Sequence, residues 1–306
     1  MAYFINYISY FLLFCILITV GCASDETKLE TGRRQYADQN FTQAFATLTP
    51  LAQKDIAEAQ LYLGNLYYMG KGISKDHEKA LNWYLQAARQ GLAQAQFNLS
   101  LMYFDGEGVD KNIVKYLYWL KKAVKQELPQ AYVNLGSCFF AGRGMKQNYK
   151  KAAEYFYKAY KKGEPEGAVR LGTMYYYGQG IKQSYRKALK CYMFAAKDSL
   201  EAQAVAGMIF VKGLGCDRDI KRGTKMIESA ANAGYMQAQI AMSIMALDNN
   251  HKKQALKWLS MVKCNNGDIK KYIDKREKEI QKDKQKIKKT QDVLKQINDI
   301  WISLPN

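Results

Sequence analysis

Residues 58–72 read EAQLYLGNLYYMGKG, and residues 94–108 read QAQFNLSLMYFDGEG. The same pattern returns as QAYVNLGSCFFAGRG at 130–144, EGAVRLGTMYYYGQG at 166–180 and EAQAVAGMIFVKGLG at 201–215. Successive copies are 36 residues apart, except that the last step is 35. A short fixed period takes precedence over a domain count from the length of 306 residues, because each copy then forms one unit of a stacked array.

The quoted half of each copy has the pattern of a helix, which we call helix A. A leucine and an aromatic residue four positions later form an apolar ridge, as at Leu63 and Tyr67. Two glycines end the helix, where the first permits a left-handed conformation. Small residues recur beside the ridge, where a neighbouring helix must approach closely; they are Gly64, Ser100, Gly136, Gly172 and Gly207.

A second helical pattern, helix B, lies between the copies, with a large residue followed three positions later by alanine, as at Tyr84 and Ala87. Residues 29–54 and 236–263 keep two helices but replace the glycine loop with a short turn. Terminal units are expected to differ in this way, because each has one neighbour. The sequence therefore predicts an all-α solenoid of about seven antiparallel helix pairs over residues 29–264.

The segments outside the repeats differ in composition. Residues 265–306 are rich in lysine and predict a basic C-terminal helix, which either docks on the last repeat or serves as an arm for oligomerisation or polyanion binding. Its apolar residues recur one heptad apart. Residues 1–21 are apolar and end in small residues, which is typical of an export signal, and residues 22–28 follow as a linker.

The chain offers little material for catalysis. His77 and His251 are the two histidines of the sequence, which are too few to indicate a histidine metal cluster or a Ser-His-Asp triad. The G-x-G pairs are not completed to a phosphate-binding loop. Ser184 and Ser260 begin S-x-x-K motifs, but no K-T-G motif accompanies them. We therefore predict no enzyme, no catalytic residue, no metal site and no cofactor.

Charge and cysteine usage leave alternatives open. The net charge of +18 favours an acidic partner, although a lysine-rich solvated exterior gives the same composition. Cys138, Cys191 and Cys216 occupy positions that are apolar in the other copies, which favours buried thiols. Disulfides among these three and Cys264 remain the alternative, because an exported protein with an even number of cysteines often forms them.

The unit A-x-x-x-L-G-x-x-Y-x-x-G-x-G, with its K-A-x-x-[WY]-[YF] helix B, resembles the Sel1-like repeat, a relative of the tetratricopeptide repeat. That resemblance implies a right-handed superhelix of helix pairs and an adaptor or protein-binding role. Residues 19–22, Thr-Val-Gly-Cys, resemble the lipobox of bacterial lipoproteins, which implies lipidation at Cys22 and a place in the periplasm or outer membrane. A plain signal peptide, giving a secreted protein, and an uncleaved inner-membrane anchor fit the same segment.

In tetratricopeptide-like units helix A lines the concave surface, so the resemblance implies a binding wall there. One aromatic residue from each of four helices A forms a row on this wall, here called the aromatic ladder. The ladder either anchors a partner or fills the groove between repeats. We expect a lipid-anchored scaffold that binds a protein or peptide on this wall. The alternative function is polyanion binding by the basic surface and C-terminal helix, with lipid phosphate, glycan or nucleic acid as the ligand and nucleic acid the least expected of the three. An enzyme that acts on the cell wall or on β-lactams is the least favoured of the three functions. The predicted wall comprises Leu61, Asn65, Tyr68, Phe97, Leu101, Phe104, Val133, Ser137, Phe140, Val169, Thr173 and Tyr176, of which Tyr68, Phe104, Phe140 and Tyr176 form the ladder.

Overall fold

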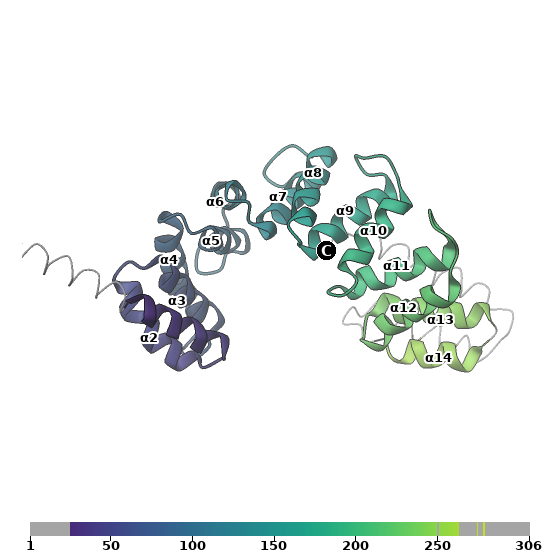
Figure 1. Ribbon diagram of the computed structural model, residues 1–306, viewed down its shortest axis with the longest axis horizontal. Coiled ribbons are helices and arrows are strands. Elements are labelled where there is room, and N and C mark those ends of the chain that lie inside the picture. The colour runs from purple at the N-terminus through teal and green to yellow at the C-terminus, as the bar shows by residue number, and fades with distance from the viewer. Residues whose placement is uncertain (1–24, 250, 263–273, 275–277, 279–306) are drawn as a thin grey trace, which may run out of the picture. The chain divides into compact units, whose positions relative to one another are not determined.

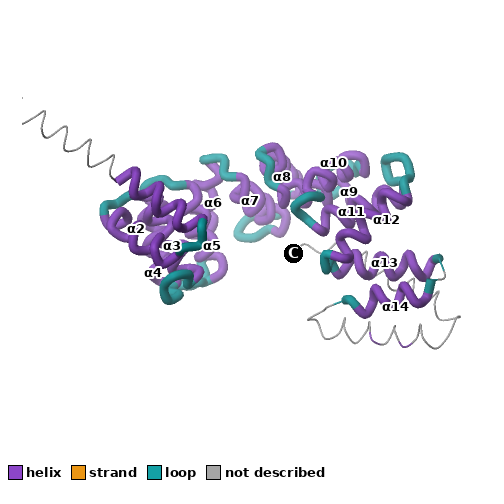
Figure 2. Tube along the Cα trace, turned by 60° about the horizontal axis from the view of Figure 1, so that its bottom comes forward, coloured by secondary structure: helices purple, strands orange, loops and turns teal. Residues whose placement is uncertain are grey.

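The computed structural model describes residues 25–249, 251–262, 274 and 278. Regular structure in these residues is helical, and a helix over 25–37 begins a series of seven consecutive pairs (Figures 1 and 2). The all-α repeat fold predicted from the period is thus confirmed. The later helices are α2 Phe41–Gln53, α3 Ala57–Met69, α4 His77–Arg89, α5 Ala93–Asp105, α6 Ile113–Lys125, α7 Pro129–Ala141, α8 Tyr149–Lys161, α9 Pro165–Tyr177, α10 Tyr185–Ala195, α11 Leu200–Lys212, α12 Ile220–Asn232, α13 Met236–Asp248 and α14 Lys252–Ser260.

The chain divides into two compact units, residues 1–131 and 132–306, here called unit 1 and unit 2. In unit 1, each helix from α3 to α5 packs against the helix before it and the helix after it. The helices from α9 to α13 do the same in unit 2. Packing between nearest neighbours along the chain is the arrangement of a stacked repeat array.

The apolar ridge and the small residues of helix A have the roles that the sequence predicts. Leu63 and Leu99 are at most 1% exposed, and Leu135 and Leu171 are 2% exposed. A Cβ atom added to Gly64 would lie 2.5 Å from the ring of Tyr84 on α4. The missing side chain therefore lets helices A and B of one pair come into direct contact.

Helix B starts with a side-chain cap, a feature beyond those that the repeat pattern predicts. The Lys79 backbone N–H donates to Asp76 Oδ1 at 2.9 Å, which satisfies one of the free donors of the first turn of α4. At α10 the Lys187 N–H donates to Ser184 Oγ at 3.4 Å, so the serine of this S-x-x-K motif is a helix cap. The equivalent caps are Asn112 on α6, Asn148 on α8 and Asp219 on α12.

The second glycine of the G-x-G loop fixes the contact between successive pairs. Gly108 has a φ of +68°, and a Cβ atom added to it would lie 2.5 Å from the carbonyl carbon and oxygen of His77. The loop after α5 therefore rests directly on the backbone at the start of α4. Gly72 makes the equivalent approach to the start of α2, Gly180 to the start of α8 and Gly215 to the start of α10.

The ends of the chain differ from the expectation or lie outside the described residues. The first helix begins at residue 25, inside the segment 22–28 that we expected as a linker. The expected signal at 1–21, the lipidation residue Cys22 and nearly all of the expected helix at 265–306 lie outside the described residues. Within the described part of the chain, no helix combines the length and the apolar character needed to cross a bilayer.

Three cysteines are described, and none of the three is joined in a disulfide. Cys138 and Cys191 are buried, as their apolar positions in the repeat indicate, whereas Cys216 is half-buried. Cys264 lies outside the described residues. Burial raises the pKa of the Cys191 thiol to about 11, because the thiolate would lose its hydration in this apolar setting.

Candidate functional site

The predicted wall residues of helix A divide into two groups by exposure. Leu61, Phe97, Val133 and Val169 are at most 8% exposed, so their side chains belong to the packed interior. The other eight, at the positions of Asn65, Tyr68 and their equivalents, are half-buried and keep part of their surface accessible. The accessible part of the wall is therefore narrower than the sequence indicates.

Each ring of the aromatic ladder lies against an aromatic side chain of its own helix B. Tyr68 stacks on His77 with ring centroids 5.1 Å apart. Phe104 lies 4.9 Å from Tyr116. In unit 2 the ring pairs are Phe140 with Tyr149 and Tyr176 with Tyr185, both 5.1 Å apart. The ladder rings thus contribute to packing within each pair and present their remaining surface to solvent.

A pocket of about 310 Å³ opens in unit 1 over three of the predicted wall residues. Asn65 and Tyr68 come from α3 and Leu101 from α5. Tyr36 comes from the helix over 25–37, so the first helices of three successive pairs contribute to one recess. Met69, Tyr84 and Asn98 complete the lining.

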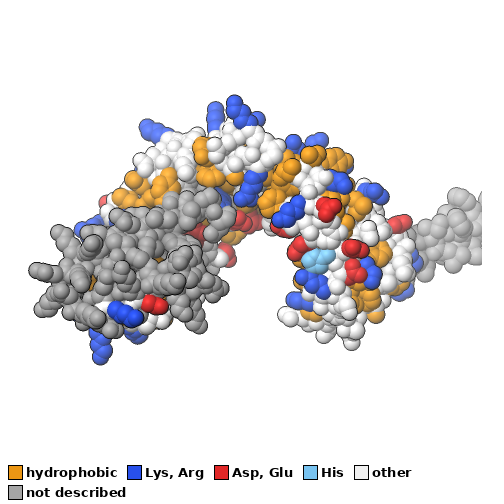
Figure 3. Space-filling model, turned by 180° about the vertical axis from the view of Figure 1, so that it is seen from behind, with side chains coloured by type: hydrophobic (Ala, Val, Ile, Leu, Met, Phe, Trp, Pro, Cys, Tyr) orange, Lys and Arg blue, Asp and Glu red, His pale blue; other side chains and the backbone are white. Residues whose placement is uncertain are grey.

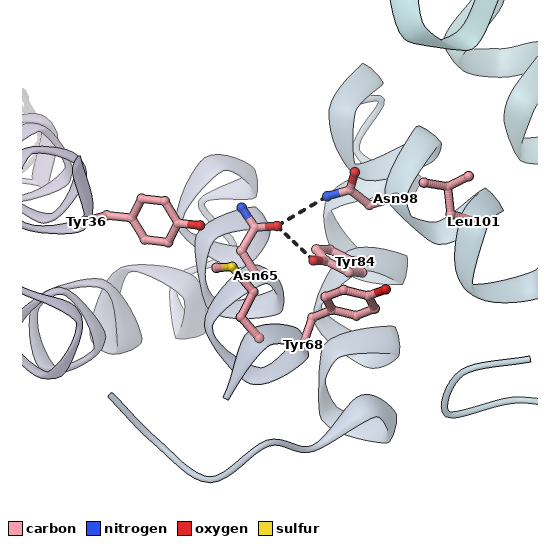
Figure 4. A pocket seen from close by; sticks show the side chains of 7 residues that line it. Tyr36, Asn65, Tyr68, Tyr84, Asn98 and Leu101 are labelled. Carbon is pink, nitrogen blue, oxygen red and sulfur yellow. Dashed lines mark hydrogen bonds between the residues drawn. The ribbon is translucent and has the colours of Figure 1, made fainter. Parts of the chain in front are cut away.

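Asn65 is the centre of the polar network in this pocket (Figure 4). Its Oδ1 accepts from the Tyr84 hydroxyl at 2.8 Å and from Asn98 Nδ2 at 3.2 Å. Figure 4 shows the Tyr36 hydroxyl on the opposite side of the Asn65 amide. Burial raises the pKa of Tyr36 and that of Tyr84, so both phenols stay protonated near neutral pH and can exchange hydrogen bonds with a bound chain.

A carboxylate lies beside the ladder ring of this pocket. A hydrogen bond to Glu107, followed by burial, raises the pKa of Tyr68 to about 12. Glu107 Oε2 is 3.9 Å from His77 Nδ1. Because the Gly108 backbone rests on His77, the repeat loop itself positions Glu107 at this place. The rim near Tyr68 is therefore polar, whereas Met69 and Leu101 supply apolar surface within the pocket.

Unit 2 repeats part of this arrangement. Thr173 occupies the same repeat position as Asn65, and Tyr192 the same position as Tyr84. The Thr173 and Tyr192 hydroxyls lie 2.9 Å apart. Thr173 Oγ1 also donates to the Val169 carbonyl, so this side chain has less freedom to bind a ligand than the amide of Asn65.

Sequence reasoning misses four residues of the pocket lining: Tyr36, Met69, Tyr84 and Asn98. The period identifies Tyr84 as a core residue of helix B, and its ring is indeed 3% exposed, but its hydroxyl reaches Asn65. Tyr36 belongs to the atypical first unit, in which the repeat gives no register. The positions equivalent to Asn98 hold Tyr62, Asn134, Arg170 and Val205. A helix A position that is polar in three of the five copies is the signal that could have identified Asn98.

In the part of the chain that the structure describes, no three His, Cys, Asp or Glu side chains are grouped as metal ligands would be. The described chemistry of the pocket consists of amides, phenols and apolar groups. Such a lining can hold a polypeptide segment by hydrogen bonds to its backbone and by contact with its side chains.

Comparisons with known proteins agree with this architecture. The Sel1 repeat model matches residues 57–92, 93–128, 129–164, 165–199 and 200–235. The chain is similar to a Sel1 repeat protein of Oxalobacter formigenes, with 30% identity, 78% of this chain and 98% of that chain covered, and a TM-score of 0.69. No curated protein sequence matches the chain.

A second solved structure of similar geometry is a protective antigen present in uropathogenic Escherichia coli strains, which displays an SLR fold. It is 26% identical, with a TM-score of 0.69 over 78% of this chain. The chain spans 53% of that protein's length. The stacked helix pairs therefore have counterparts of known structure in two bacteria.

Proposed function

The chain belongs to the Sel1 repeat family, whose members generally act as protein-interaction scaffolds and are mostly not enzymes, and we propose that it binds a peptide segment of a partner protein in the unit 1 pocket. The observation that carries this proposal is the pocket of about 310 Å³. It opens over Asn65, Tyr68 and Leu101, three residues of the wall predicted from the repeat.

The composition of the pocket suits a polypeptide better than a small charged metabolite. Asn65 and Asn98 carry amide groups, which can donate to and accept from a peptide backbone. Tyr36 and Tyr68 are stiff aromatic residues with part of their surface accessible, and such residues anchor protein interfaces at a small cost in side-chain entropy. Leu101 and Met69 offer contact area for one apolar side chain of the partner.

Affinity purification tests the proposal. The tagged full-length protein is recovered from its native envelope, and the bound proteins are identified by mass spectrometry. We expect Tyr68→Ala with Leu101→Ala, both in the pocket lining, to remove the partner, since truncating a central aromatic residue typically costs about 2 kcal/mol or more in binding. Tyr118→Ala with Tyr157→Ala is the matched control, because these exposed tyrosines, at 53% and 48% exposure, line no part of the pocket.

A thermal unfolding scan of each variant separates binding from folding. The proposal holds if the pocket variant loses the partner with an intact thermal transition and the control variant keeps it. It fails if both variants retain the partner, or if the pocket variant loses binding together with its thermal transition. Repeating the recovery at high salt distinguishes polyanion binding, which would weaken steeply.

We further propose that Cys22 anchors the protein to a bacterial membrane after export, on the basis of the Thr-Val-Gly-Cys sequence at 19–22. Acyl chains on one cysteine would hold the repeats at the membrane surface. Metabolic labelling with a palmitate analogue should mark the wild-type protein, whereas Cys22→Ala should be unlabelled and appear in the soluble exported fraction. Membrane retention of the unlabelled variant would instead support an uncleaved anchor.

A further inference from the structure

Three segments of unit 2 carry an unusual concentration of positive charge at the start of their helices B. They occupy the same repeat position, where the chain leaves the glycine loop and enters α8, α10 or α12. We call residues 146–151, 182–187 and 217–222 together the basic edge. Its nine cations are all exposed: Lys146, Lys150, Lys151, Lys182, Arg186, Lys187, Arg218, Lys221 and Arg222.

The structure places these segments next to one another. The Gly180 loop rests on Tyr149 and Lys150 at the start of α8. The Gly215 loop rests on Tyr185 and Arg186 at the start of α10. Each loop leads within a few residues into the next of the three segments, so the cations form one continuous edge of unit 2.

Contacts with helix A hold some of these cations in place. Lys151 Nζ lies 5.3 Å from the ring centroid of Phe139, and Lys187 Nζ lies 5.3 Å from that of Tyr175. The Arg222 guanidinium lies 4.3 Å from the ring of Phe210. Among the described residues, none of the nine cations forms an ion pair with a carboxylate. Their charge is thus available to a partner.

The charge belongs to unit 2 and not to the repeat as such. The segments of unit 1 at the same repeat position, 74–79 and 110–115, contain four Lys or Arg and three Asp or Glu, a net charge of +1. The three segments of the basic edge contain nine cations and two carboxylates, a net charge of +7. A uniformly lysine-rich exterior does not account for this difference. Figure 3 shows Lys and Arg side chains among apolar ones on the face that it draws.

Exposed apolar side chains accompany the cations. Tyr149 is the first residue of α8 and is 36% exposed, and Ile220 is the first residue of α12 and is 49% exposed. The Tyr149 hydroxyl accepts from Gln147 Nε2 at 3.1 Å, which orients the ring. Cations beside exposed aliphatic and aromatic groups are the combination that binds the headgroup region of an anionic bilayer. A soluble polyanion would use the cations alone.

We propose that the basic edge docks on the surface of a membrane rich in anionic phospholipid. This proposal is independent of the peptide pocket in unit 1 and of lipidation at Cys22. Phosphate groups of the lipids would neutralise the cations, while Tyr149 and Ile220 would enter the interfacial layer. Each cation near such a surface contributes roughly fivefold to the affinity.

Hydrogen–deuterium exchange on the full-length protein tests the proposal, because the measurement reports the edge itself even if the N-terminus also binds lipid. The protein is incubated with vesicles of phosphatidylcholine alone or of phosphatidylcholine with phosphatidylglycerol. We expect slower exchange at 146–151, 182–187 and 217–222 in the anionic vesicles, with no change at 110–115.

Two charge-reversal variants sharpen the test. Lys150→Glu with Arg186→Glu should abolish the lipid-dependent protection, because losing two cations weakens binding at least about 25-fold. Lys75→Glu with Lys111→Glu makes the same charge change on the corresponding edge of unit 1 and should leave the protection intact. Equal protection in the two vesicle types, or protection that survives the Lys150 and Arg186 reversal, would overturn the proposal.

A third variant separates a membrane from a soluble polyanion. Ile220→Ser should reduce protection by anionic vesicles and leave the binding of soluble polyphosphate unchanged. If Ile220→Ser has no effect on vesicle binding while polyphosphate protects the same segments, the edge binds soluble polyanions and the membrane proposal is wrong.

Discussion

Replacing Gly108 with alanine should destabilise unit 1 far more than its backbone angle accounts for. A left-handed conformation costs a non-glycine residue about 1–2 kcal/mol. The new Cβ would also lie 2.5 Å from the carbonyl carbon and oxygen of His77, which are backbone atoms that cannot move aside as a flexible side chain could. Overpacking of this kind adds roughly 1–3 kcal/mol, so we expect a total loss of about 2–5 kcal/mol.

Gly91→Ala is the matched control. Gly91 lies in the turn between α4 and α5 with a φ of +99°, and a Cβ atom there would meet nothing within 4 Å. Its substitution therefore carries the backbone strain without the collision. The free energy of unfolding is measured for both variants by urea denaturation, followed by far-ultraviolet circular dichroism. Losses that agree within about 0.5 kcal/mol would refute the idea that the glycine loop rests on the preceding pair.

Three further predictions follow from burial. Leu99→Ala should cost about 2–5 kcal/mol in urea denaturation because the side chain is fully buried, whereas Leu29→Ala, at a partly buried site, should cost less; equal losses would contradict the stacked arrangement. Gln96→Leu should cost about 1–3 kcal/mol, measured in the same way, since two side-chain hydrogen bonds of a buried residue would be lost: that of Gln96 Nε2 to the Ala88 carbonyl and that of Gln126 Nε2 to Gln96 Oε1. Iodoacetamide at neutral pH should label Cys216 in the native protein and Cys191 only after unfolding, because the raised pKa of Cys191 in the folded protein, about 11 against an ordinary value of 9.0, keeps its thiolate scarce. The same shift contributes stability that is lost as the pH rises through 11. Labelled residues are identified by peptide mass mapping, and labelling of Cys191 in the native protein would contradict the prediction.

The repeat period was enough to predict the fold, because the same physical constraint recurs in every copy. Leu63 and Gly64 have equivalents in each central unit, and each equivalent is buried for the same reason. The caps of helix B could also have been predicted, since Asp76, Asn112 and Ser184 are typical N-cap residues in register. The contact of Gly108 with His77 could not be predicted, because it joins two successive helix pairs whose distance in space the sequence does not give.

The candidate site was predictable in part. The period places Asn65, Tyr68 and Leu101 on one face of helix A, and the pocket forms over that face. The period also places Leu61 and Phe97 there, yet both are buried, because α3 and α5 pack against the helix on each side and leave a narrow accessible strip. Side-chain reach, such as that of the Tyr84 hydroxyl to Asn65, depends on three-dimensional distances that a one-dimensional pattern does not contain.

The buried glutamines of unit 1 form a donor chain that runs from pair to pair. Gln60 Nε2 donates to the Ala52 carbonyl, and Gln96 Nε2 donates to the Ala88 carbonyl, in each case to the helix before. Gln60 Oε1 accepts from Gln90, and Gln96 Oε1 accepts from Gln126. A recombination event that added or removed a whole unit would rejoin this chain, since donor and acceptor recur at the same offset. A gain or loss of part of a copy would leave a buried amide unmatched, so these hydrogen bonds require the spacing of 36 residues between Gln60 and Gln96.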